Sequence, residues 1–336
     1  MKKLIIDEGI PFLRGRIEHL FDCHYVAGDD ITPSVVADAD GLLVRTRTRC
    51  GEPLLGNSNV KLVATGTIGI DHFDTEWLES RGIDWYNAPG CNAPGVAQYV
   101  WSALLRAGFQ PKRTGHNRLG VVGYGHVGSI VAEWGRRLGA EVLVCDPPRR
   151  EAGRDDLDYI SLSEMAREVD AVTFHTPLTK RGPHATYHLC SEDILARLKP
   201  DTILINAARG GVVDEAALRR VTQDKHLRVI LDTWEGEPAV STETLDLTLI
   251  ATPHIAGYSR QGKQRATLAI INALQRHFDV EISTDGLASP YSPPHLFSEQ
   301  LILESFDPMP VDAALRGEPA EFETQRDSYI FREELL

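Results

Sequence analysis

The chain has 336 residues and a mass of 37.2 kDa, enough for about two domains with large cores. Its 48 acidic against 35 basic residues give a net charge of −13, which argues against nucleic-acid binding and against binding to anionic membranes. No apolar run reaches the roughly 18–20 residues that span a bilayer, and acids at positions 7 and 8 come too early for a signal peptide. Five scattered cysteines without a CxxC pair indicate reduced thiols in a cytoplasmic protein, and neither a disulfide framework nor a zinc site.

The first ninety residues are predicted to form parallel βα units. Short apolar runs occur at residues 4–6, 41–44 and 60–64, and each is followed by polar residues or glycine. Runs of this kind, separated by the length of a helix, are typical of buried parallel strands. Because open α/β sheets bind ligands at the carboxyl ends of their strands, the residues that follow these runs are candidate ligand contacts.

A second α/β block begins near residue 117 and alternates strands with helices of suitable length. This is the pattern of a doubly wound domain. Helical spacing also predicts helices at about 94–106 and 261–278, and the second is expected to pack back on the first block. The strands of the second block are predicted at residues 119–122, 141–146, 171–174, 202–206 and 228–232.

The sequence changes in character near residue 285. Prolines become frequent, and from residue 297 onward there are ten acidic residues against three arginines. The same segment holds too many apolar side chains for a disordered tail. A small ordered appendage is therefore expected at 283–336.

Residues 123–128 read Gly-Tyr-Gly-His-Val-Gly, which matches the dinucleotide-binding pattern G-x-G-x-x-G between a predicted strand and a predicted helix. Gly123 permits the tight turn, Gly125 lets a pyrophosphate approach the backbone, and Gly128 lets helix and strand pack closely. The helix N-terminus adds free N–H groups and a positive dipole for the phosphates. The pattern and its context predict a dinucleotide site.

The next strand supplies a residue that distinguishes between cofactors. Asp146 lies 18 residues after the last glycine and is placed to bond both hydroxyls of the adenosine ribose. Its charge would repel a 2′-phosphate, so NAD is favoured over NADP. Arg149 and Arg150 follow closely and keep NADP open as an alternative.

Three further segments place a cation, a carboxylate and an imidazole at strand ends. These groups are Arg209, Glu237 and His254. Reversible hydride transfer to a 2-oxo acid needs an arginine fork for the carboxylate and carbonyl, an imidazole that exchanges the hydroxyl proton, and a carboxylate that orients the imidazole and raises its pKa. Each residue alone also fits a structural role, but their convergence after a dinucleotide fold favours catalysis.

With these motifs the chain resembles the NAD-dependent D-2-hydroxyacid dehydrogenases over nearly its whole length. The resemblance implies two doubly wound, Rossmann-like α/β domains with a cleft between them, plus a small C-terminal dimerisation segment. The expected divisions are a substrate-binding domain at 1–92 completed by about 259–282, an NAD-binding domain at 93–258, and the segment at 283–336. The motifs that carry it are at residues 123–128, 175–179 (His-Thr-Pro-Leu-Thr), 205–214 (Ile-Asn-Ala-Ala-Arg-Gly-Gly-Val-Val-Asp) and 252–254 (Thr-Pro-His).

Carried over position by position, the resemblance also implies functional residues. The catalytic set is Arg209, Glu237 and His254, with His254 as proton donor and acceptor. Position 98 is glutamine where glutamate is common in the family, and the sequence offers no interpretation of this difference. The implied cofactor contacts, with those of the glycine motif, are Gly123, Gly125, His126, Val127, Gly128, Asp146, Thr176, Ala207, Asp232 and Gly257. The implied substrate contacts are Thr46, Thr67 and Tyr258, with Arg45 and Arg47 beside them.

The activity that the resemblance implies is oxidation of a small phosphorylated D-2-hydroxy acid, 4-phospho-D-erythronate, to its 2-oxo acid, with NAD as cofactor and no metal. This reaction belongs to pyridoxal 5′-phosphate biosynthesis, and a homodimer is expected. One alternative is a related dehydrogenase of another D-2-hydroxy acid, such as phosphoglycerate. An alternative of another class is an NAD(H)-responsive binding protein without catalysis.

Overall fold

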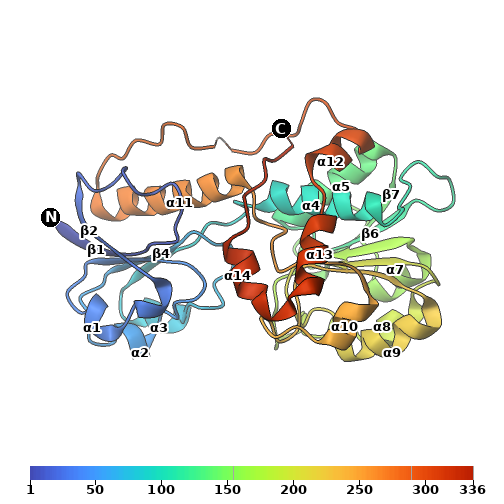
Figure 1. Cartoon of the computed structure of the whole chain (residues 1–336), viewed down its shortest axis with the longest axis horizontal. Helices are drawn as coiled ribbons and strands as arrows, with labels where there is room; N and C mark the ends of the chain where they lie inside the picture. Colours follow the sequence, from blue (N-terminus) through green and yellow to red (C-terminus); the bar gives the residue numbers. More distant parts are fainter. Residues whose placement is uncertain (154, 289, 336) are drawn as a thin grey trace. The chain divides into compact units, whose positions relative to one another are not determined.

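The computed structural model describes residues 1–153, 155–288 and 290–335. The chain divides into two compact units: Met1–Asn92 with Ser259–Tyr291, and Ala93–Tyr258 with Ser292–Leu336. Each unit is built on one parallel sheet with helices on both faces (Figure 1). The predicted fold class, two parallel α/β units, is confirmed. Residues 292–336 belong to the second unit by their contacts, and their role in dimerisation stays a prediction.

The sheet of the first unit has the strand order β2-β1-β3-β4-β5, and all neighbours are parallel. Its strands are β1 (Lys2–Asp7), β2 (Phe21–Val26), β3 (Gly41–Val44), β4 (Leu62–Thr65) and β5 (Asp84–Tyr86). Its helices are η1 (Gly28–Asp30), α1 (Pro33–Val36), α2 (Glu52–Leu55), α3 (Thr75–Ser80) and α11 (Arg260–Phe278).

Alternation along the strands gives this sheet two buried faces. On β1, Leu4 and Ile6 point to a cluster with α11, whereas Ile5 points to a cluster with α1, α2 and α3. This is the period of two that a strand imposes on its side chains. Both clusters are apolar, so the strands read as short continuous apolar runs, as expected for a sheet covered on both sides.

The first unit also buries a histidine whose pKa is lowered, and this predicts that acid destabilises the unit. His72 is 7% exposed, its Nε2 has no hydrogen-bond partner among the described residues, and its ring packs on Phe73 at 4.5 Å between centroids. Burial lowers the pKa of His72 from 6.5 to about 4, and the charge of Asp71 offsets only part of this. The unfolded chain therefore binds a proton at this residue in the window between pH 6.5 and pH 4, where the folded chain does not.

We expect the free energy of unfolding to fall by about 2 kcal/mol from pH 7 to pH 5 through this residue, and by about 3 kcal/mol at pH 4. Urea unfolding of the native chain and of His72→Gln at pH 7 and pH 5 measures the difference. The variant should lose less stability on acidification than the native chain. His19→Gln, which changes an exposed histidine of the same unit, is the control for the loss of a histidine side chain. Equal acid sensitivity of His72→Gln and the native chain would contradict the prediction.

The second unit has a six-stranded parallel sheet in the order β11-β10-β9-β8-β6-β7. Its strands are β6 (Arg118–Val122), β7 (Glu141–Cys145), β8 (Ala171–Phe174), β9 (Ile203–Asn206), β10 (Arg228–Leu231) and β11 (Thr248–Ala251). Its helices are α4 (Ala93–Arg106), α5 (His126–Leu138), α6 (Pro147–Glu151), α7 (Leu162–Glu168), α8 (Glu192–Arg197), α9 (Glu215–Lys225), α10 (Thr242–Leu247), α12 (Glu299–Ser305), α13 (Met309–Gly317), η2 (Pro319–Glu321) and α14 (Phe322–Asp327).

Helices α4 and α5 cover one face of this sheet, and α7 to α10 cover the other (Figure 1). The strands again send alternate side chains to the two faces. Val121 points to the cluster with α4 and α5, and Val122 points to the cluster with α7 to α10. The turn from β6 into α5 is tight, and α5 is followed by Gly139, whose φ of 97° is the left-handed conformation typical of a helix C-cap. The carboxyl ends of all six strands lie at one edge because the strands are parallel.

The C-terminal appendage is ordered, as the apolar residues predicted. Ile302, Leu315 and Phe322 are fully buried, one in each of α12, α13 and α14. Helix α13 lies along the edge strand β11, where the Asp312 carboxylate accepts the amide of Ala251 at 2.7 Å. The appendage therefore covers a sheet edge that would otherwise expose unpaired backbone groups.

Most predicted elements occur within two residues of their expected bounds. The strand expected at 60–64 lies at 62–65, and the one expected at 202–206 begins at residue 203. Two strands of the first unit, β2 and β5, have no counterpart among the predicted elements. Both are edge strands, and their partly exposed side chains break the continuous apolar run that marks the central strands.

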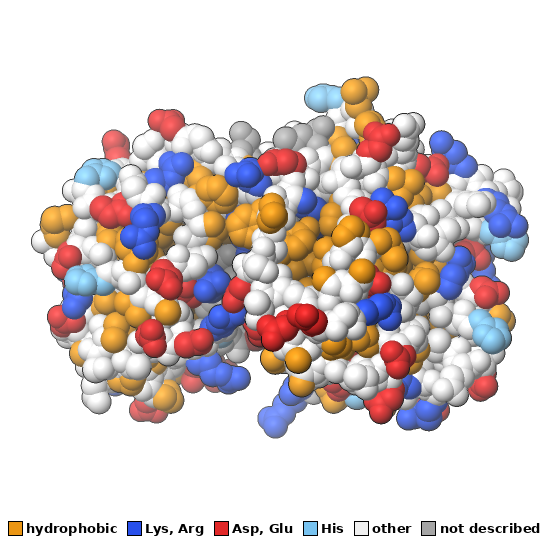
Figure 2. Space-filling model, viewed as in Figure 1, with side chains coloured by type: hydrophobic (Ala, Val, Ile, Leu, Met, Phe, Trp, Pro, Cys, Tyr) orange, Lys and Arg blue, Asp and Glu red, His pale blue; other side chains and the backbone are white. Residues whose placement is uncertain are grey.

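On the face drawn in Figure 2, acidic and basic side chains are interspersed over each unit. None of the helices in the described part of the chain combines the length and the apolar character that a membrane span needs. All five cysteines are free thiols.

Candidate active site

The glycine motif forms the turn between β6 and α5. Gly123 has a φ of 89°, and a Cβ there would lie 2.7 Å from the carbonyl oxygen of His175. A Cβ on Gly128 would lie 1.9 Å from the carbonyl oxygen of Gly123. By contrast, a Cβ on Gly125 would meet no protein atom within 4 Å. Packing therefore requires the first and last glycine, while the middle one borders open space, as a site for a pyrophosphate needs.

Asp146 stands at the end of β7 with both carboxylate oxygens fixed by backbone amides. Oδ2 accepts from Tyr124 N at 2.8 Å and Oδ1 accepts from Arg149 N at 2.9 Å. Each oxygen keeps a further lone pair for a ribose hydroxyl. The Arg149 guanidinium is already engaged, by Asp155 at 2.6 Å and by the Tyr124 carbonyl at 2.9 Å. Of the two arginines that keep NADP open, Arg149 therefore has strong partners inside the protein.

Glu237 and His254 are brought together as the sequence indicated. His254 Nδ1 and Glu237 Oε1 are 2.7 Å apart. Burial alone would raise the pKa of Glu237, but the hydrogen bond and charge of His254 outweigh it, with smaller contributions from the Trp234 amide and from the Arg326 charge, so the pKa is lowered. Glu237 is thus an anion at neutral pH, and it binds Nδ1 of the imidazole ring. Nε2 is the ring nitrogen that takes no part in this pair.

The backbone at His254 is in an unusual conformation. Its φ of 57° lies in the left-handed region, which non-glycine residues seldom adopt. Asp232, fully buried at the end of β10, accepts the amide of Ile255 at 2.8 Å and of Ala256 at 2.9 Å. Burial raises the pKa of Asp232, while the charge of His254 and these hydrogen bonds act against the rise. Asp232 therefore holds the loop after His254, and its predicted contact with a nicotinamide stays a prediction.

Trp234 joins the two loops that carry the pair. Its amide donates to Glu237 Oε2 at 3.3 Å, and its indole Nε1 donates to the Thr252 carbonyl at 2.9 Å. The side chain is fully buried. Trp234 is not among the residues predicted from the sequence. Its position two residues after Asp232, which directly follows β10, was the signal that could have assigned it a role.

Arg209 follows β9 on a turn that packs against the Trp234 loop. The Asn206 side chain closes the turn, donating to the Arg209 carbonyl at 2.9 Å and accepting the Ala208 amide at 3.1 Å. A Cβ on Gly210 would lie 1.9 Å from the Trp234 carbonyl oxygen, so the two loops touch through their backbones. Arg209, Glu237 and His254 thus come from neighbouring strand ends of one sheet.

The other implied cofactor contacts also lie at this edge. His126 and Val127 open α5, and Gly257 lies in the loop after His254. Thr176 follows β8 and Ala207 follows β9. The hydroxyl of Thr176 is buried without a hydrogen-bond partner among the described residues, and so is that of Thr233. Two orphaned hydroxyls at the strand ends suit a polar ligand that would satisfy them.

The implied substrate residues of the first unit lie at the carboxyl ends of its strands. Thr46 is exposed just after β3, and Thr67 lies after the adjacent β4, where its hydroxyl bonds Thr65 at 2.8 Å. Arg45 Nε donates to Asp7 Oδ1 at 3.0 Å, and the Asp7 side chain is fully buried. Arg47 lies two residues after Arg45 and is half-buried.

The acid that holds Arg45 was absent from the predicted site. Asp7 Oδ1 also accepts the Gly9 amide at 2.9 Å, whereas its Oδ2 has no hydrogen-bond partner among the described residues. A Cβ on Gly9 would meet the Arg45 guanidinium at 2.2 Å, so the cation rests on the backbone there. The signal was available, because Asp7 directly follows the apolar run 4–6.

Tyr258, the remaining implied substrate contact, is half-buried in the second unit. Its ring meets Tyr329 and Phe331 edge to face, each at 6.2 Å between centroids. The C-terminal appendage therefore packs against a predicted site residue.

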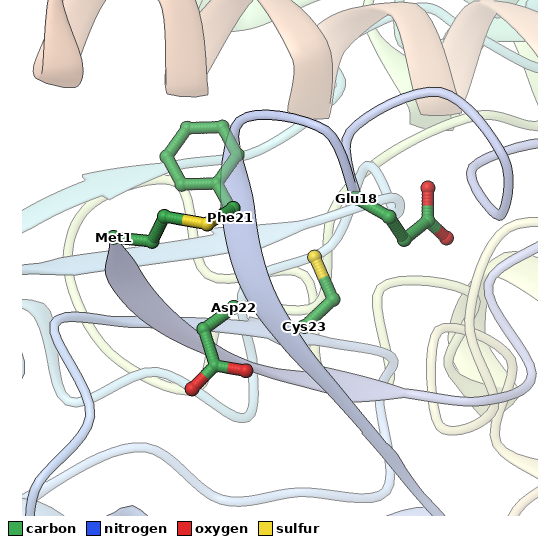
Figure 3. Close-up of a pocket in the computed structure, with 5 residues that line it drawn as sticks. All are labelled: Met1, Glu18, Phe21, Asp22 and Cys23. Carbon is green, nitrogen blue, oxygen red and sulfur yellow. The ribbon is translucent and has the colours of Figure 1, made fainter.

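A hollow of about 480 Å³ on the first unit is not part of this site. It lies beside β1 and β2 and is lined by Met1, Glu18, Phe21, Asp22 and Cys23 (Figure 3). Burial and the nearby carboxylates raise the pKa of the Cys23 thiol to about 12, so the thiol is a poor nucleophile. Two carboxylates also make the hollow unsuited to an anionic substrate. Among the described residues there is no group of three or more His, Cys, Asp or Glu side chains that could hold a metal ion.

Residues 96–256 match the family model described as D-isomer specific 2-hydroxyacid dehydrogenase, NAD binding domain. The chain is 42% identical to an erythronate-4-phosphate dehydrogenase of Bacteroides fragilis, over 99% of this chain and 97% of the relative. It is 41% identical to an erythronate-4-phosphate dehydrogenase of Porphyromonas gingivalis, over 97% and 92% of the two chains. Among solved structures it is similar to a D-lactate dehydrogenase from Aquifex aeolicus in complex with NAD and lactic acid. That similarity has a TM-score of 0.70 and 25% identity, and covers 83% of this chain and 96% of the other.

Proposed function

The chain belongs to the D-isomer specific 2-hydroxyacid dehydrogenases, and we propose that it oxidises 4-phospho-D-erythronate to (R)-3-hydroxy-2-oxo-4-phosphooxybutanoate with NAD. The observation that carries this function is the identity of 41–42%, over nearly the full length of both chains, to relatives named for this substrate. The product is an intermediate of pyridoxal 5′-phosphate biosynthesis, as the resemblance implies.

The residues at the edge of the second sheet fit NAD. The pyrophosphate suits the open space at Gly125 and the N-terminus of α5. The adenosine ribose suits the Asp146 carboxylate. Thr176 and Thr233 offer buried hydroxyls that have no hydrogen-bond partner within the described part of the chain. Bound NAD supplies the acceptor for the hydride that leaves C2 of the substrate.

His254 and Glu237 handle the proton of the substrate. We propose that His254 Nε2 accepts the proton of the C2 hydroxyl as the C–H bond is broken. Glu237, held 2.7 Å from Nδ1, orients the ring and stabilises the imidazolium that forms. The lowered pKa of Glu237 keeps this partner ionised during the exchange.

Different residues are proposed to bind the carboxylate and the phosphate of the substrate. The Arg209 fork suits a carboxylate and the adjacent oxygen at C2. Thr46, Thr67 and the Arg45 guanidinium that Asp7 holds suit a phosphate dianion, because they combine hydroxyls with a fixed cation. Tyr258 adds a phenolic hydroxyl. These assignments rest on residue type and position along the strands.

A substrate panel tests the function. Purified protein with NAD should produce NADH absorbance with 4-phospho-D-erythronate and far less with D-3-phosphoglycerate or D-lactate. Turnover of phosphoglycerate in preference would select the related dehydrogenase instead. NADH binding without turnover of any hydroxy acid in the panel would favour the non-catalytic binding protein.

The cofactor preference is expected to depend on Asp146. Losing its charge-assisted bonds to the ribose should lower kcat/KM for NAD by about 10–100-fold in Asp146→Ser, while kcat/KM for NADP falls less or rises. Serine can still cap α6, which Asp146 begins. Adding Asp155→Asn frees Arg149 and should raise NADP use further. Glu151→Gln, which removes another acid of the same helix, is the control. Equal use of NAD and NADP by the native chain would contradict this assignment.

A homodimer formed through residues 283–336 and a cytoplasmic location are also part of the proposal. Free cysteines and an ordered C-terminal appendage support them. Sedimentation of the native chain beside a chain that ends before residue 292 tests the dimer.

A further inference from the structure

The C-terminal segment after α14 brings a buried arginine to the loop that follows His254. Arg332 is 9% exposed. Its Nη1 donates to the carbonyl oxygens of Ile255 at 3.1 Å and of Tyr258 at 3.3 Å, and its Nη2 donates to that of Ala256. One guanidinium thus binds three carbonyls within four residues of the loop, which uses the planar fork of donors that only arginine has.

Arg332 is itself held from helix α4. Its Nη2 donates to the Gly95 carbonyl at 2.7 Å, its Nε lies 3.3 Å from Gln98 Oε1, and its guanidinium stands 4.5 Å from the centroid of the Phe306 ring. Gln98 also donates to the Glu333 carbonyl at 3.1 Å. The glutamine that the sequence left without an interpretation therefore fixes the segment that carries Arg332.

The loop after His254 is held through both its amide and its carbonyl groups. Asp232 accepts the amides of Ile255 and Ala256, and Arg332 donates to the carbonyls of the same two residues. All hydrogen-bond partners of Arg332 among the described residues are neutral. Most of them are backbone carbonyls, and none is a carboxylate. A buried cation without an anion is costly unless such bonds satisfy it.

We propose that Arg332 is a positioning residue of the reaction, which holds residues 254–258 so that the His254 imidazole stays aligned with Glu237 and the substrate. The left-handed φ of His254 is disfavoured for a histidine, so the surrounding structure must hold it there. Arg332 and Asp232 supply that hold from opposite sides. The inference rests on the proposed function, because it concerns the alignment of His254, the proton acceptor in that function.

Replacing Arg332 by methionine keeps an unbranched stem of four atoms and removes the donors. In the full chain we expect kcat to fall by about 10²-fold, because a small misplacement of a catalytic group has effects of this size. The affinity for NADH, from fluorescence titration, should change far less. Arg332→Lys keeps the charge with fewer donors and should be intermediate, and Gln98→Ala should change kcat in the same direction by a smaller factor. Hydrogen–deuterium exchange at the amides of Ile255 and Ala256 should become at least about tenfold faster in Arg332→Met.

Arg316 provides a matched control from the same appendage. It pairs with Asp312 at 2.9 Å and donates to the Leu245 carbonyl at 2.8 Å, next to β11 and not in the loop of His254. Arg316→Met should lower thermal stability and leave kcat and the exchange at residues 255 and 256 unchanged at temperatures where it is folded.

The outcomes separate the inference from the function on which it rests. Arg332→Met with kcat within about threefold of the native chain and unchanged exchange would overturn it, as would equal effects in Arg316→Met. If Arg332→Met does not fold, Arg332→Lys and Gln98→Ala decide, and full activity with native exchange in both would overturn it. If the native chain does not oxidise 4-phospho-D-erythronate, the proposed function fails, and the exchange experiment still tests whether Arg332 holds the loop.

Discussion

Replacing His254 by alanine is expected to lower kcat by about 10²–10⁴-fold while NADH still binds. The imidazole is the group that accepts the C2 proton, and its pair with Glu237 at 2.7 Å lies apart from the glycine turn and Asp146. Steady-state kinetics with 4-phospho-D-erythronate and an NADH fluorescence titration measure the two effects. His184→Ala is the matched control, because it removes a surface histidine that is also paired with a glutamate, Glu151 at 2.9 Å.

Glu237→Gln separates the role of the pair from that of the imidazole alone. Glu237 is ionised beside the ring, and its charge stabilises the imidazolium that forms when the ring accepts a proton. Without this anion kcat for oxidation should fall, because the imidazolium is less stabilised and the ring is less well oriented. An unchanged kcat in Glu237→Gln, or full activity in His254→Ala, would show that this pair does not exchange the substrate proton.

The preference for a phosphorylated substrate is the second large effect that we expect. 4-Phospho-D-erythronate should be oxidised with kcat/KM several powers of ten above that of D-erythronate. Each charge-assisted contact to the phosphate contributes on the order of 1.5–3 kcal/mol, and two or three of them are lost together when the phosphate is absent. Thr46, Thr67 and the Arg45 that Asp7 fixes are the proposed contacts.

Single replacements test those contacts. Tyr258→Phe and Thr67→Val should each narrow the preference for the phosphorylated substrate and leave the affinity for NAD unchanged. Tyr25→Phe is the control, because it removes the hydroxyl of a tyrosine on the edge strand β2, which donates to Glu18. If both substrates are oxidised equally well by the native chain, the family assignment stands and the assignment of this substrate fails.

The sequence by itself determined the central strands of both sheets and the residues at the ends of these strands. Central parallel strands are encoded locally, because burial on both faces makes each one a short apolar run. The glycines at 123, 125 and 128 and the acid at 146 are encoded at fixed spacing, since the turn and the ribose contact require it. Three further site residues could be named before their geometry was known, because each follows a strand of one sheet. They are Arg209, Glu237 and His254.

Only the tertiary structure decided what holds those residues in place. Arg332 is 77 positions from Ile255 and 237 from Gly95, and no local pattern marks a contact over such a separation. Asp7 and Asp232 likewise read as strand-end acids, and only packing shows that one fixes Arg45 and the other the amides after His254. Local sequence sets which groups reach the strand ends, whereas the buried hydrogen bonds that orient them depend on distant segments that meet only when the chain has folded.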